Sequence, residues 1–210
     1  MSIPVSQLAL CVLALSALGA QRAPQIDTTT PNQDTMERIV AARETGPEHL
    51  RLMDCLGSWE VERREWRVAG QPEPAITKAI VHNTSILGGR YLRMAMTWRV
   101  GSELRESVSF VGFDKRKGNY DLITLDSATT WPTRSTGTWV QTKNNIVFDS
   151  EQNDPLTNQT TQLSTILAFT KGSWQVSVNK IVHVPGVDEP TRFKALEIVS
   201  TKKTAAVVGR

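Results

Sequence analysis

Residues 90–100, with the sequence RYLRMAMTWRV, determine the fold class predicted for this chain. Apolar side chains occupy every second position of this stretch, at Leu92, Met94, Met96, Trp98 and Val100. Successive side chains of an extended strand point to opposite faces, so one face of this segment is apolar and the other polar. The alternation predicts a β-strand with one face against a core and the other in water.

The same period of two continues along most of the chain. Further segments of this kind lie at residues 58–66, 76–87, 104–114, 120–126, 136–142, 145–150, 160–170, 174–184 and 192–201. Short connections with turn residues, such as Gly88-Gly89 and Lys117-Gly118-Asn119, join them. Short hairpins make sequence neighbours antiparallel, and closing the sheet on itself removes exposed edges. The sequence therefore predicts a mainly β fold, an antiparallel barrel of about ten strands at residues 46–203.

The first 20 residues differ from the rest of the chain. They contain no Asp, Glu, Lys or Arg, and a nearly continuous apolar run ends at Ala20. This run is short for a membrane span and ends in a small residue, which is typical of a secretory signal peptide. We therefore expect an exported protein, periplasmic or secreted, with no stable membrane insertion after cleavage. The cleaved chain keeps Cys55 as its one cysteine, which excludes an internal disulfide.

Two short segments flank the predicted barrel. Residues 21–45 are expected to form a tether with a possible short helix, and residues 204–210 a C-terminal tail. Within the barrel domain, Pro47 follows Gly46 at the start of a short N-terminal helix, where proline is favoured at the first helical position.

Charge and histidine content argue against several function classes. The 24 basic and 21 acidic residues are scattered and give a net charge of +3, whereas nucleic-acid binding requires a concentrated basic surface. The three histidines have no paired spacing, so no metal site and no cofactor are predicted. Haem held through His183 stays as an alternative, although the strand pattern directs that side chain outward. The chain has no nucleophile elbow and no phosphate-binding loop.

Four motifs resemble the DUF1579 family of bacterial, often exported proteins of uncharacterised function. They are Gly46-Pro47-Glu48-His49, Leu56-Gly57-Ser58-Trp59, Ile86-Leu87-Gly88-Gly89-Arg90-Tyr91-Leu92, and Gly112-Phe113-Asp114 followed by Tyr120. The resemblance implies a lipocalin-like (calycin) barrel whose Trp59 closes one end beneath a cation from the last strand, either Arg192 or Lys194. It carries over no catalytic residue. The tryptophan usual in the family after Tyr120 is absent here.

Three functions remain open. The favoured one is binding of a small, partly apolar molecule in the barrel lumen, by analogy with similar folds. Its candidate ligand-binding residues are Met94, Met96, Trp98, Glu106, Phe110, Tyr120, Trp139 and Lys180. Glu106 and Lys180 interrupt apolar faces, where a charge needs a partner or a ligand. The alternatives are an enzyme in which Glu106, Lys180 or Tyr91 transfers a proton, and a filled barrel acting as an envelope interaction or structural protein.

Overall fold

A computed structural model describes residues 32–153, 160–170, 172–182 and 189–204. The predicted signal peptide at residues 1–20 and His183 both lie outside the described residues. The chain divides into two units, one ending at Val40 and one beginning at Ala41. Helix α1 (Gln33–Arg43), which includes this boundary, buries none of its side chains and begins where Asn32 Oδ1 accepts the Thr35 N–H at 2.8 Å. No helix in the described part of the chain is long and apolar enough to cross a membrane.

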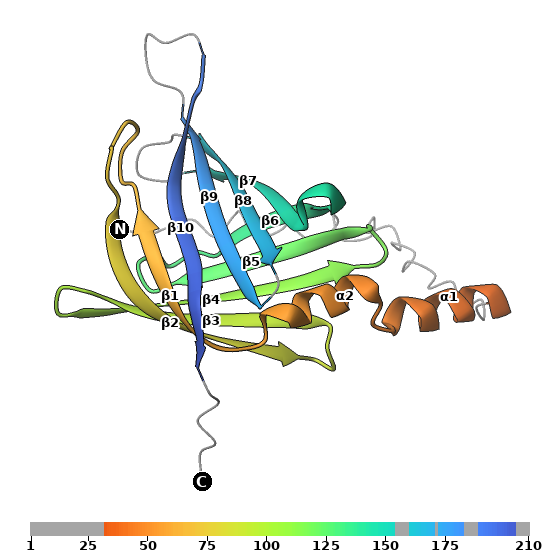
Figure 1. The fold of residues 1–210 in the computed structure, drawn as a ribbon. Coiled ribbons are helices and arrows are strands. Elements are labelled where there is room, and N and C mark those ends of the chain that lie inside the picture. The colour runs from red at the N-terminus through yellow and green to blue at the C-terminus, as the bar shows by residue number, and fades with distance from the viewer. Residues whose placement is uncertain (1–31, 154–159, 171, 183–188, 205–210) are drawn as a thin grey trace, which may run out of the picture. The chain divides into compact units, whose positions relative to one another are not determined.

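The second unit is a closed antiparallel barrel of ten strands (Figure 1). The strands are β1 (Gly57–Glu65), β2 (Ala75–Ile86), β3 (Tyr91–Val100), β4 (Glu103–Asp114), β5 (Asn119–Asp126), β6 (Thr133–Val140), β7 (Asn145–Asn153), β8 (Thr160–Thr170), β9 (Ser173–Val182) and β10 (Thr191–Thr204). Each strand pairs with the next in sequence, and β10 closes the barrel on β1. The predicted mainly β, ten-stranded antiparallel barrel is therefore confirmed.

The turn between β2 and β3 contains two glycines because its backbone takes a left-handed conformation. Leu87, Gly88 and Gly89 all have positive φ, at 52°, 67° and 85°. Glycine reaches this left-handed region without steric cost, so two of the three positions are relaxed. The turn closes with a hydrogen bond from Gly89 N–H to Ile86 O at 3.2 Å.

Helix α2 (Pro47–Leu52) and the short 3₁₀ helix η1 (Met53–Cys55) that follows it cover one end of the barrel (Figure 1), and we call them the plug. Leu52 and Cys55 are completely buried there. The Cys55 carbonyl accepts hydrogen bonds from Trp59 Nε1 and Asn83 Nδ2, both at 2.8 Å. Tyr120 on β5 donates its hydroxyl to Glu48 O at 3.2 Å. These bonds fix the plug to three separate strands.

His49 in the plug has a structural role. It is buried, and burial lowers the pKa of its imidazole, with Lys115 nearby adding to the effect. The ring accepts the Gly46 N–H at Nδ1, 3.0 Å away, and packs edge-on against Phe113 at 6.0 Å. A neutral histidine therefore caps α2 and joins the plug to β4.

Aromatic side chains fill the barrel next to the plug. Trp59 packs edge-on against Trp174 with ring centroids 6.3 Å apart, and Phe113 meets Tyr120 in the same way at 4.9 Å. The prediction that Arg192 or Lys194 supplies the cation over Trp59 is wrong. The register pairs Trp59 with the far end of β10, at Lys203, while Lys194 lies over a different ring, that of Trp66, at 5.7 Å.

Candidate functional site

The lumen holds a cavity of about 240 Å³ in the half of the barrel away from the plug. All ten strands contribute to its wall. Its apolar lining consists of Val81, Met94, Met96, Trp98, Val111, Leu122, Phe148, Leu163, Leu167, Trp174, Val176, Val178, Leu196 and Ile198. Its polar lining consists of Arg63, Ser107, Ser109, Thr124, Asp126, Thr133, Ser135, Gln152 and Thr165. A mostly apolar wall with a few polar groups is typical of small-molecule sites.

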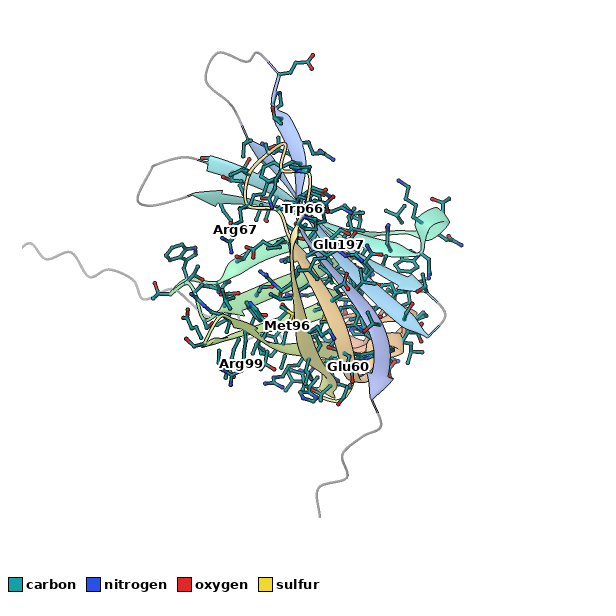
Figure 2. All side chains as sticks on the ribbon, turned by 60° about the vertical axis from the view of Figure 1, so that its left-hand side comes forward. Glu60, Trp66, Arg67, Met96, Arg99 and Glu197 are labelled. Carbon is teal, nitrogen blue, oxygen red and sulfur yellow. The ribbon has the colours of Figure 1, made fainter. Side chains whose placement is uncertain are left out.

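Strand β3 supplies the large flexible part of this wall. Met94, Met96 and Trp98 all line the cavity and are buried, as the alternation along this strand predicts. Met96 is labelled in Figure 2. Methionine is unbranched and polarisable, so it adapts to ligands of different shape. These three candidates therefore come together in one apolar surface.

Arg63 on β1 is the cation of the described wall, and sequence reasoning missed it. Its side chain is only 12% exposed, and its Nη1 donates to Glu65 Oε2 at 2.9 Å. The guanidinium carbon lies 4.9 Å from the centre of the Trp98 ring, within the range of a cation–π interaction. Its Nε is buried and has no hydrogen-bond partner among the described residues. The alternation Trp59, Val61, Arg63 was the signal that could have placed it in the lumen.

Trp174, at the inner end of the cavity, resembles Arg63 in having a buried polar atom without a hydrogen-bond partner among the described residues. The residue is 2% exposed, and its Nε1 also lacks a partner in the described structure. Most buried polar groups in proteins are hydrogen-bonded, so each exception requires an explanation. Arg63 Nε and Trp174 Nε1 are both closed off by surrounding protein atoms, so they belong to the packed part of the wall and not to its open surface.

The predicted inward orientation of Glu106 and Phe110 is wrong. On β4 the cavity-lining residues are Ser107, Ser109 and Val111, so the alternate positions point outward. Glu106 is exposed on the outer surface. The prediction assumed that the more apolar face of β4 points into the barrel. The lumen beside β4 is partly polar, and the more apolar face of the strand points outward.

Tyr120 and Trp139 belong to the plug end and not to the cavity wall. The Tyr120 hydroxyl lies under Glu48, and burial raises its pKa. Trp139 packs against Phe169 with centroids 5.9 Å apart, and the guanidinium carbon of Arg51 lies 4.7 Å from its ring centre. Both side chains therefore close the barrel beneath the plug.

The three groups considered for proton transfer do not come together. Glu106 is exposed on the outside of β4, and the Tyr91 ring covers the outer face of Gly112 at the plug end. Lys180 is half-buried and is the next residue on its face of β9 after Val178, opposite Leu163. A catalytic pair needs hydrogen-bond reach, which this arrangement does not provide. Within the described residues, no three His, Cys, Asp or Glu side chains could hold a metal ion.

A second hollow, of about 340 Å³, lies outside the barrel beside the plug. Several of its charged side chains already have partners. Lys115 donates to Ala41 O at 2.9 Å, and Arg90 donates to the carbonyls of Leu87 and Arg43. Hydrogen bonds from Arg116 lower the pKa of Asp114 to about 2. This hollow is therefore best explained as a set of structural contacts.

Comparison with known protein families gives one match. The model of a family described as "Protein of unknown function (DUF1579)" matches residues 44–186. No curated protein matches the chain. The matched span contains the plug and strands β1 to β9, and so includes most of the cavity wall.

Proposed function

The chain belongs to the DUF1579 family, and we propose that this member binds a small, partly apolar molecule in its barrel lumen. The observation that carries the proposal is the cavity of about 240 Å³, whose mostly apolar wall includes the Arg63 guanidinium. Apolar side chains gain many small attractive contacts with an apolar group that packs against them. A ligand with an apolar part and a polar group near Arg63 would match this wall.

The size of the cavity limits the ligand. Sites for drug-sized molecules usually measure about 300–1,000 Å³, so a cavity of about 240 Å³ suits a smaller molecule. The adaptable side chains Met94 and Met96 favour a flexible alkyl or aryl group over a rigid polar one. We therefore expect a molecule with one apolar part and one compact polar head.

The other two functions have less support. Proton transfer would require Glu106, Lys180 or Tyr91 to converge in the cavity, and their positions on the barrel do not favour this. A filled barrel would have side chains in the volume that is open here.

Export remains part of the proposal and rests on residues 1–20. Their lack of charge and the apolar run up to Ala20 support a signal peptide. N-terminal sequencing of the protein recovered from the cell envelope should find a new terminus near Gln21. Recovery of the chain with Met1 retained would oppose export by this route.

Lumen binding can be tested with octanamide, a neutral molecule with a short alkyl chain. Binding should quench or shift the fluorescence of Trp98 and Trp174, because both rings line the cavity. Thr165→Phe places a ring in the cavity and should abolish binding. Thr138→Phe is the matched control, since Thr138 is exposed on β6, and it should bind like the native chain.

Thermal unfolding of both variants must show that each is folded. Octanamide binding that survives Thr165→Phe, or no binding of either octanamide or its charged analogue octanoate to the native chain, would refute lumen binding. Native mass spectrometry of protein purified from its own envelope should in addition show a co-purifying small mass.

A further inference from the structure

We propose that the ligand is an amphipathic carboxylate whose head pairs with Arg63 and whose apolar part lies along Met94 and Met96. This inference rests on the proposed lumen binding and names the chemical class of the ligand. It depends on two properties of Arg63, namely its position in the cavity wall and its fixed orientation.

The Arg63 guanidinium is held in place before any ligand arrives. Glu65 binds its Nη1 at 2.9 Å, and Trp98 lies against its face at 4.9 Å. These two contacts hold the planar guanidinium at the wall of the cavity. A planar fork of N–H donors matches the two oxygens of a carboxylate, and a fixed fork loses little entropy on binding.

Arg63 is the group of the described wall that can pair with an anionic head. Its carboxylate partner Glu65 is 35% exposed, so water screens part of that pair. Asp126 is the other charged member of the described wall, and it accepts the Ala128 N–H at 2.7 Å. A hydrogen bond from a charged donor to a charged acceptor is about twice as strong as a neutral one. A cationic head would face a like charge at Arg63 and would have to pair with Asp126 instead.

The register of the strands places head and tail at different depths. Arg63 pairs with Thr77 on β2 and with Ile198 on β10. Along β3, Trp98 lies beside Arg63, whereas Met96 and Met94 follow in order toward the plug. A carboxylate at Arg63 therefore directs an alkyl chain inward along the two methionines, toward Trp174.

The experiment compares octanoate with octanamide, which has a similar shape and no charge, by calorimetry on the full chain. The native chain should bind octanoate at least about tenfold more tightly. Arg63→Met removes the donors and should weaken octanoate about 10- to 100-fold while changing octanamide by less than about threefold. Arg99→Met is the matched control, because Arg99 is exposed on the outer face of β3 (Figure 2). It should change neither affinity.

The outcomes separate this inference from the proposed function. If octanamide binds the native chain as tightly as octanoate, or if octylamine binds more tightly than both, the carboxylate assignment is wrong and lumen binding stands. If none of the three binds, both proposals are wrong. The comparison of ligands on the native chain needs no variant, so it decides the question even if Arg63→Met does not fold. Arg63→Lys, which keeps the charge without the fork, should recover only part of the octanoate affinity.

Discussion

Replacing Glu197 by Gln should destabilise the barrel at its closing seam. Glu197 lies on the outer face of β10, and its side chain is only 9% exposed. Its carboxylate accepts hydrogen bonds from Arg64 on β1 at 2.9 Å, from Lys194 at 2.6 Å and from Gln175 on β9 at 2.9 Å. It thus links the first strand to the last two, at the seam where β10 closes the barrel on β1; Glu197 is labelled in Figure 2.

The expected loss follows from burial and from the exposure of the partners. Breaking a fully buried ion pair costs about 3–5 kcal/mol, whereas an exposed pair contributes about 0–1 kcal/mol. Glu197 is buried, but Arg64 and Lys194 are 39% and 41% exposed, so water screens both cations. We therefore expect Glu197→Gln to lower the free energy of unfolding by about 1–2 kcal/mol.

The stabilisation that Glu197 provides should also depend on pH in a definite direction. Burial opposes ionisation of Glu197, but hydrogen bonds from Lys194 and Arg64 outweigh it and hold its pKa below the ordinary value. Its contribution is therefore complete above the unfolded-state pKa of about 4.3 and is lost as the pH falls through the lower folded-state pKa. The stability difference between the native chain and Glu197→Gln should be constant near neutral pH and shrink in acid.

Urea unfolding of both proteins from pH 7 down to pH 3 measures this difference. Glu103→Gln is the control, because Glu103 also pairs with an arginine, Arg105 at 2.8 Å, but is 59% exposed. Its effect should stay below about 0.5 kcal/mol. An equal loss in the two variants, or a loss for Glu197→Gln that does not change with pH, would refute the reasoning.

Two further predictions concern packing near the plug. A Cβ at Gly137 would lie 2.5 Å from Phe148 Cδ1 and 2.8 Å from a backbone oxygen inside the barrel, so Gly137→Ala should cost about 1–3 kcal/mol in urea unfolding. Gly112→Ala meets only the Tyr91 ring, which is 36% exposed and can move aside, so it should cost less; the reverse order would contradict the packing described here. Burial raises the pKa of the Cys55 thiol, so a thiol reagent should label it only after denaturation, and rapid labelling of the native chain would show that the plug opens.

The barrel was predictable because its signal is repeated. The alternation at residues 90–100 recurs in every strand, and the short turns between them leave few ways to connect the sheet. The inward face of a single strand is harder to predict. On β4 the apolar residues Leu104, Val108 and Phe110 share the outward parity, while Ser107 and Ser109 face the lumen. Hydropathy predicts the inward face only when the interior is apolar.

The sequence pattern also could not predict which residues of distant segments contact each other. Trp59 was paired with Arg192 or Lys194 because the resemblance implies a cation above this tryptophan, but the register instead places Lys203 opposite Trp59. A bulge between Glu60 and Val61 shifts the pairing of β1 with β10, and another between Lys194 and Leu196 shifts the pairing of β10 with β9. The alternation along one strand does not show which residues of two strands lie opposite each other.

The four motifs that carry the family resemblance lie away from the cavity, although the span matched by the family model includes most of the cavity wall. The matching motifs supply the plug, its cap and its hairpin, at Gly46, His49, Gly89 and Phe113, and among the described residues none of the motif positions lines the cavity. These motifs therefore account for how the barrel is closed at the plug end. For the proposed ligand, specificity would come from the cavity wall, in which Arg63 is the cation among the described residues. A related chain that keeps these motifs but has an apolar residue in place of Arg63 should fold in the same way and lose the preference for carboxylates.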